Sequence, residues 1–130
     1  MKKLMIAVLL TPLAVVSTGC SHQNQTQAAD FTKKTTSGIR SKAKTYSQAA
    51  YQSASIPAHS YVRLVGKVVK TDAATAQIRQ GDRFVLQRGK LKVQVFHQAQ
   101  TPVRLGQTVT VYGEYYGFVK GYVIDQEAKQ

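Results

Sequence analysis

The side chains most often used in catalysis are sparse and scattered in this chain. It contains three histidines, His22, His59 and His97. They stand far apart, and none has a cysteine or carboxylate at the spacing of metal ligands. No serine lies in a Gly-x-Ser-x-Gly turn, and no glycine-rich phosphate loop is present. Glu114 and Asp125 could meet on adjacent strands as an acid–base pair, but pairing with Lys120 or an arginine is the simpler expectation. These observations predict a protein that is not an enzyme and has no metal or cofactor.

Attraction of polyanions is a second kind of chemistry, and the composition favours it. The 18 lysines and arginines outnumber the six aspartates and glutamates, so the formal net charge is +12. Such an excess attracts nucleic acid, anionic lipid headgroups or phosphate-bearing wall polymers. A high positive charge also keeps a protein soluble, so the charge alone names no partner.

Cys20 is the only cysteine, so no intramolecular disulfide can form. It follows two lysines and an apolar run over residues 4–16, which is too short to cross a membrane comfortably and is typical of a signal peptide. The sequence Ser-Thr-Gly-Cys over 17–20 resembles a bacterial lipobox, although Ser17 replaces the usual leucine. The resemblance implies cleavage of residues 1–19 and attachment of a lipid, such as diacylglycerol, to the Cys20 thiol. Ordinary signal cleavage is the alternative.

Residues 20–38 are predicted to form a flexible tether behind the lipidated cysteine. No leucine or valine occurs in residues 21–60, and residues 21–30 in particular have little to bury. Acyl chains hold a protein firmly on a bilayer. We therefore expect the mature chain on the cell membrane or the outer membrane, facing the extracellular or periplasmic side.

A short helix is predicted within residues 39–56. Ile39, Ala43, Tyr46, Ala50 and Ser53 recur at helical spacing. They indicate a helix at about residues 40–54, since Pro57 lacks the N–H that a continuing helix requires.

The composition changes at Ser60, where β-branched and aromatic residues take over and glycines punctuate the chain. Five strands are predicted, over 60–71, 83–87, 91–97, 108–116 and 118–125. Two polar connections, 72–82 and 98–107, are predicted as loops. The inner faces are predicted to hold Val62, Leu64, Gly66, Val68, Phe84, Leu86, Leu91, Val93, Val95, Val109 and Val111. Thr110 and Tyr112 are expected outside, and His97 is expected to face water. Gly66 in mid-strand indicates a bend or bulge.

These strands favour an all-β fold, a small five-stranded OB-like barrel over residues 60–127, preceded by the helix and the tether. Closure hides the strand edges that an open sheet would expose; an open sandwich or half-barrel is the alternative. Four sequence patterns resemble those of bacterial OB-fold, tRNA-anticodon-like binding domains, which include exported lipoproteins. They are V-x-L-x-G-x-V over 62–68, F-x-L over 84–86, V-x-V-F over 93–96 and L-G-Q-x-V-x-V-x-G over 105–113. The resemblance covers residues 46–125.

The resemblance implies a ligand across the second and third strands, flanked by the loops between strands 1 and 2 and strands 4 and 5. The candidate ligand-binding residues are Arg79, Arg83, Arg88, Lys90, Lys92, Phe96, Tyr112, Tyr116, Phe118 and Lys120. Basic side chains would contact phosphates, and aromatic rings would stack on bases or sugars. The aromatic residues could instead stabilise strand pairing alone.

These features predict a membrane-anchored envelope lipoprotein that acts as a non-catalytic binding module for an anionic polymer, either a wall polymer or nucleic acid. The alternative is a protein-interaction or structural subunit of an envelope complex, or a stress-tolerance factor. No specific residue supports a third role, the inhibition or assistance of an envelope hydrolase.

Overall fold

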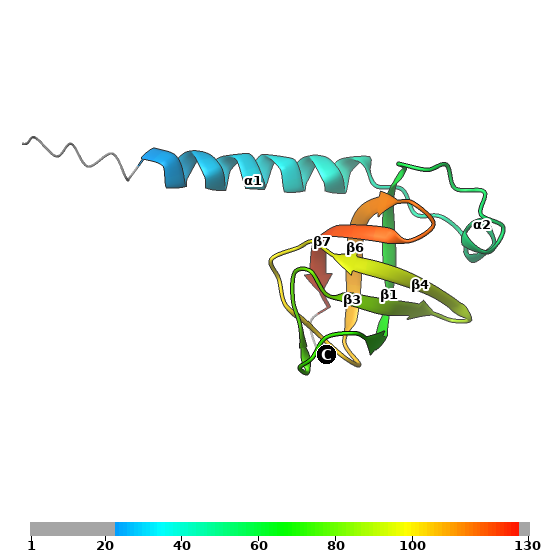
Figure 1. The fold of residues 1–130 in the computed structure, drawn as a ribbon. Coiled ribbons are helices and arrows are strands. Elements are labelled where there is room, and N and C mark those ends of the chain that lie inside the picture. The colour runs from blue at the N-terminus through cyan, green and yellow to red at the C-terminus, as the bar shows by residue number, and fades with distance from the viewer. Residues whose placement is uncertain (1–22, 128–130) are drawn as a thin grey trace, which may run out of the picture.

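The computed structural model describes residues 23–127 (Figure 1). The predicted signal peptide, residues 1–19, and the predicted lipid attachment at Cys20 lie outside this range. No helix in the described part of the chain combines the length and apolar character needed to cross a bilayer.

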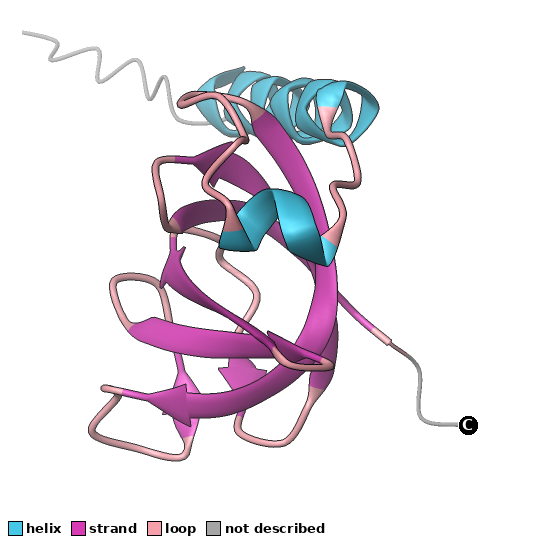
Figure 2. Cartoon of the chain, turned by 90° about the vertical axis from the view of Figure 1, so that its right-hand side faces the viewer, coloured by secondary structure: helices cyan, strands magenta, loops and turns pink. Residues whose placement is uncertain are grey.

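Two helices precede a β-rich region. The helices are α1 (Gln23–Lys42) and α2 (Gln48–Gln52). The strands are β1 (Tyr61–Thr71), β2 (Gln77–Ile78), β3 (Arg83–Arg88), β4 (Leu91–His97), β5 (Val103–Arg104), β6 (Thr108–Tyr115) and β7 (Val119–Gln126). Five of them close a barrel in the order β1-β3-β4-β7-β6, and β2 pairs separately with β5 (Figures 1 and 2). The expected mainly-β class and closed five-stranded barrel are confirmed, and the architecture is compatible with an OB-like fold.

The first strand bends so that it can serve two neighbours. Its first part pairs with β6 and its last part with β3, and the register shifts between Val68 and Lys70. Gly66 lies where β3 crosses closely: a Cβ atom there would stand 2.6 Å from the Gln87 carbonyl oxygen. Only glycine fits there without displacing backbone, so Gly66 marks a close crossing of the two strands, and the irregularity in β1 lies further along, between Val68 and Lys70.

The barrel interior follows the predicted alternation. The predicted inward side chains of β1, β3, β4 and β6 are buried. Ile78 and Val103, which pair across β2 and β5, are fully buried in the same cluster. Helix α2 adds Tyr51, whose ring meets that of Tyr115 edge to face at 5.8 Å. Ser47 caps this helix by accepting the Ala50 N–H.

The N-terminal helices differ from the prediction. Helix α1 occupies most of the segment 20–38 that was predicted as a flexible tether. Its glutamine, alanine and lysine residues have good intrinsic helix propensity, although they form no apolar stripe. The helix predicted at 40–54 is interrupted and survives only as α2. The cause is tertiary: the Lys44 N–H donates to the Tyr61 carbonyl and the Lys44 carbonyl accepts from Arg63, so Lys44 pairs with the edge of β1.

The expectation that His97 faces water is wrong, because its side chain is fully buried. It continues the inward series of alternate β4 residues after Val95. Its Nε2 lies 2.9 Å from the Thr101 carbonyl oxygen, so that nitrogen must be the donor. Thr110 is also buried, at 6% exposure, although it was expected outside.

Candidate functional site

Basic side chains line one outer surface of the barrel, which we call the cationic face. Strand register groups its residues into three rows: Lys67, Gln87 and Lys92; Lys70, Val85 and Gln94; and Arg83, Phe96 and Lys120. Cross-strand neighbours project from the same side of a sheet. Each row therefore presents at least one cation outward, and none of the nine residues is acidic.

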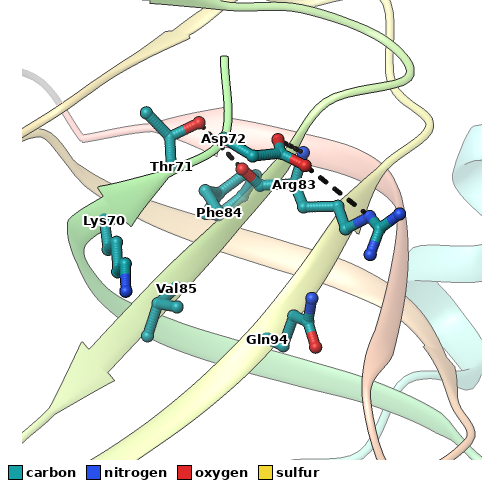
Figure 3. Close-up of a pocket in the computed structure, with 7 residues that line it drawn as sticks. All are labelled: Lys70, Thr71, Asp72, Arg83, Phe84, Val85 and Gln94. Atoms are coloured by element: carbon teal, nitrogen blue, oxygen red, sulfur yellow. Dashed lines mark hydrogen bonds and ion pairs between the residues drawn. The ribbon is translucent and has the colours of Figure 1, made fainter.

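Three hollows follow this face. One of about 300 Å³ is lined by Lys70, Thr71, Asp72, Arg83, Phe84, Val85 and Gln94 (Figure 3). A second of about 270 Å³ is lined by Arg83, Gln94, Phe96 and Phe118. A third of about 540 Å³ is lined by Val69, Lys70, Val85, Gln87, Lys92 and Gln94. Gln94 lines all three, so the hollows lie next to one another over β3 and β4, and we call them together the groove.

Arg83 is the best-positioned cation of the groove. Asp72 accepts the Arg83 backbone N–H at 2.7 Å, and its other oxygen lies 3.7 Å from the guanidinium Nε (Figure 3). Both side chains are 56% exposed, so this long ion pair is weak. The guanidinium lies 5.8 Å from the centre of the Phe96 ring. Arg83 is thus oriented over an aromatic ring but keeps most of its charge available.

An aromatic cluster of Tyr116, Phe118 and His59 borders the groove at the β6–β7 turn. The Tyr116 and Phe118 rings stack at 5.9 Å with an interplanar angle of 28°. His59 meets Tyr116 edge to face at 4.7 Å, and the Lys120 amine lies 4.8 Å from the Tyr116 ring centre. These contacts hold Phe118 against Tyr116, yet Phe118 stays 37% exposed.

Glu114 is the carboxylate beneath this cluster. Hydrogen bonding from Tyr116, and then from His59, lowers the pKa of Glu114. Its Oε1 lies 3.0 Å from His59 Nδ1 and its Oε2 lies 3.4 Å from the Tyr122 hydroxyl. The same bond to Glu114 raises the pKa of the Tyr116 hydroxyl to about 12. Glu114 therefore stays ionised at neutral pH.

Glu114 and Asp125 do not form an acid–base pair. Glu114 pairs in register with Lys120, whereas Asp125 pairs with Thr110 at the other end of β6. Asp125 forms an ion pair with Arg40 of α1, as its expected pairing with an arginine anticipated.

The structure brings together only some of the predicted ligand-binding residues. Arg83, Lys92, Phe96 and Lys120 lie on the cationic face, and Tyr116 and Phe118 border it. Arg88 and Lys90 are exposed at the β3–β4 turn, beyond the row that contains Lys92. Arg79 lies in the loop after β2, where its guanidinium donates to the Gln77 side chain.

Tyr112 is separated from the cationic face. It lies on β6, which neighbours β1 and β7 and has no contact in the sheet with β3 or β4. Arg40 of α1 lies 5.7 Å from the centre of its ring. Tyr112 therefore helps to seat the helix.

Sequence reasoning missed Lys67, Lys70, Gln94 and His59 as members of this region. Lys67 and Gln94 were placed outward by alternation, but nothing distinguished them from other exposed residues. Simple alternation turns Lys70 inward with Val68. The shift in register between those two residues brings Lys70 to the outer face instead, and no local signal announces it.

Comparison with models of known protein families, with curated proteins and with solved structures found no match. Over the residues that the structure describes, no group of three or more His, Cys, Asp or Glu side chains could hold a metal ion. The fold and site therefore define a small closed β-barrel with a cationic, aromatic-bordered groove on its outer surface.

Proposed function

We propose that this chain is a membrane-anchored envelope lipoprotein whose barrel binds an anionic polymer without catalysing a reaction. Lipid attachment at Cys20 would hold it at the membrane, and the cationic face would hold the polymer. The apolar and glycine patterns of the strands, together with the closed barrel, support membership of the exported OB-fold lipoproteins that the sequence resembles.

The observation that carries this proposal is the arrangement of charge in the three rows. Five cations, Lys67, Lys70, Arg83, Lys92 and Lys120, project over β1, β3, β4 and β7, and Lys120 alone among them has an acidic neighbour in the strand register, Glu114 of β6. Two carboxylates flank these cations: Asp72, half-exposed beside Arg83, and Glu114, which lies beside Lys120 and is hydrogen-bonded to His59. A strip in which cations outnumber the adjacent carboxylates suits a chain of regularly spaced phosphates, because each contact releases condensed counterions.

The test is binding of labelled polyphosphate, with salt varied, to the whole chain solubilised in a nonionic detergent. We expect the logarithm of the association constant to fall linearly with the logarithm of salt concentration. The double variant Lys70→Glu/Lys92→Glu should lose most of the affinity. Lys33→Glu/Lys34→Glu is the matched control, since it changes the net charge equally on exposed residues of α1.

Equal losses in the two double variants would mean that net charge acts and that the face does not. Binding that resists salt would contradict the electrostatic mechanism. The anchor is tested separately: Cys20→Ala should abolish labelling by radioactive palmitate and release the protein from the membrane fraction.

A further inference from the structure

A hollow of about 360 Å³ lies between helix α1 and the barrel, and we call it the seam hollow. Helix α1 packs on β1, β6 and β7 (Figure 1). The hollow is lined by Thr36 and Arg40 of α1, by Gln80, by residues 98–101 of the loop after β4 and by residues 122–125 of β7. None of these residues lines the groove of the cationic face. The volume lies in the range of roughly 300–1,000 Å³ that is usual for ligand pockets.

The hollow lies where one edge of β7 loses its strand partner. β7 pairs with β6 along its length, but with β4 only over Val119–Gly121. Beyond that point, the Gln98 N–H donates to the Gly121 carbonyl, and the next link is the Gln126 side chain, which donates to the Pro102 carbonyl. Among the described residues, no backbone hydrogen bond joins the loop to residues 122–125 between these two links. Since strand backbone groups point alternately to the two sides, some N–H and C=O groups of this segment face the loop without a strand partner.

A β-bulge opens this seam. From Gly113 to Tyr112 the register of β6 advances by one residue, whereas β7 advances from Gly121 to Val123, so Tyr122 is the extra residue. A bulge bends its strand and can end pairing with a neighbour. The bulge begins at the last residue that β7 pairs with β4, so the open edge is built into the barrel.

The side chains around the seam hollow offer hydrogen bonds but no net charge. Gln80, Gln98 and Gln100 each carry an amide with donors and an acceptor. Gln80 donates to the Gln98 carbonyl at 3.2 Å, whereas the side-chain amides of Gln98 and Gln100 have no hydrogen-bond partner among the described residues. The one cation and the one carboxylate of the lining, Arg40 and Asp125, pair with each other. A polyanion would therefore gain little here.

An open strand edge beside free amides fits a peptide backbone better than a sugar ring. An extended peptide presents N–H and C=O groups at the spacing of a strand, and addition of a strand to an unpaired edge is a common mode of peptide recognition. A glutamine amide can donate to and accept from the same peptide group. The hydroxyls of a sugar have other spacings and cannot pair in register with β7.

We propose that the seam hollow binds a short extended segment of another polypeptide, which pairs with the open edge of β7 and is held by the glutamine amides. The segment is neutral, because Arg40 and Asp125 neutralise each other. Its side chains are small, because Ala99, Val123 and Ile124 are already buried beneath the hollow. This site is separate from the cationic face, so it goes beyond the proposed function and does not depend on it.

The experiment follows backbone amide resonances of the ¹⁵N-labelled whole chain in nonionic detergent while tetra-alanine, acetylated and amidated at its ends, is added. We expect shifts that saturate at residues 98–101 and 122–125. The analogue with a methyl group on every alanine nitrogen should bind about tenfold more weakly, because it cannot donate to the strand edge. Gln98→Leu should weaken binding of tetra-alanine about fivefold, the effect of one hydrogen bond.

Gln94→Leu is the matched control, because it replaces a glutamine of the groove, and it should bind tetra-alanine as the wild type does. Unchanged resonances in β1 and β3 would show that Gln98→Leu still folds, and the methylated peptide tests the same point without altering the protein. No shift at the two segments, or equal binding of both peptides, would overturn the proposal. Shifts there with N-acetylglucosamine trimer but not with tetra-alanine would overturn it in favour of a glycan. Polyphosphate titrations report on the other face, so the proposed function stands or fails separately.

Discussion

Two arginines, one on helix α1 and one on the barrel, lie over aromatic rings beside an aspartate, and the two groups differ in their ion pairs. Arg40 of α1 lies 5.7 Å from the Tyr112 ring centre and forms a close ion pair with Asp125. Arg83 of β3 lies 5.8 Å from the Phe96 ring centre, but its ion pair with Asp72 is 3.7 Å long. The ring distances are nearly the same, so the carboxylate makes the difference.

The two aspartates differ because they serve different partners. The Asp125 carboxylate contacts the Arg40 guanidinium directly, so this ion pair neutralises the charge of Arg40 and joins helix α1 to β7. The Asp72 carboxylate is directed mainly to the Arg83 backbone N–H, which it accepts at 2.7 Å. Arg83 therefore remains a partly free cation above a hollow, whereas Arg40 is a structural link. The same residue types give a docking contact in one place and a candidate binding contact in the other.

The largest effect should come from the close crossing of β1 and β3 at Gly66, because Asp72 follows the end of β1 and Arg83 begins β3. Gly66→Ala places a Cβ atom against the Gln87 carbonyl and should destabilise the fold by about 3 kcal/mol. Gly38→Ala is the control: it meets nothing within 4 Å in α1 and should stabilise by about 1 kcal/mol. Urea denaturation measures both. Similar free energies of unfolding for the two variants would contradict the close crossing of β1 and β3.

Replacing each arginine in turn tests the comparison directly. Arg83→Ala should weaken polyphosphate binding about tenfold at low salt and reduce the salt slope by about one, because one phosphate contact is lost. Its stability should change little, since its ion pair is exposed. Titrations at several salt concentrations provide the measurement.

Arg40→Ala should leave the affinity and the salt slope unchanged. It should instead speed amide hydrogen exchange in the last turns of α1, because the link to Asp125 and Tyr112 is lost. An equal loss of affinity in both variants would show that the two arginines are not divided between structure and binding.

Acidification should affect the Arg40 side of the barrel first. Burial lowers the pKa of His97 below its usual value, and the smaller opposing effects come from the Thr101 carbonyl and Asp82. The fold therefore favours the neutral imidazole, and the unfolded chain takes up the proton more readily. The contribution of neutral His97 to the free energy of unfolding is fully present above about pH 6.5, the pKa of histidine in an unfolded chain. It falls as the pH drops below that value.

The loop that His97 holds explains the location of this effect. Residues 98–101 line a hollow of about 360 Å³ beside Arg40. Amide protection factors in this loop, which correct for the slower intrinsic exchange in acid, should fall between pH 7 and 5 before those in β3 do. His97→Leu should remove the pH dependence. The same pH dependence of loop protection in the wild type and in His97→Leu would contradict the assignment of this effect to His97.

The smallest effect should come from neutralising the weaker aspartate. Asp72→Asn keeps an oxygen that can accept the Arg83 N–H but removes the charge near the guanidinium. Polyphosphate affinity should rise about twofold, since an exposed ion pair contributes little. Asp125→Asn, the matched change at the other arginine, should not raise it. A reversed order would place the binding site beside α1.

The strands were predictable because their signal is local. Alternation of apolar and polar residues placed β4 at residues 91–97, as observed, and β1 within one residue of its observed start. The pairing of β2 with β5 was missed, because each strand is two residues long and its partner lies far away in the sequence. His97 was misassigned because its polarity was given more weight than its position two residues after Val95.

The candidate site was only partly predictable, because it depends on pairing between strands that are far apart in the sequence. Arg83, Lys92, Phe96 and Lys120 were named from their place in the resemblance, and register confirms that they share a face. Tyr112 was named with them, but the strand order places it on β6. Which aromatic rings gather around a groove depends on how strands far apart in the chain pair.

The amino-acid sequence by itself determined the strands, their inward side chains and the excess of positive charge, because these follow from neighbouring residues and composition. Only the tertiary structure decided which cations act together. Closure of the barrel placed β7 beside β4, and the register shift in β1 turned Lys70 outward. Strand pairing and bulges are set by packing across the whole barrel, so no short stretch of sequence specifies them.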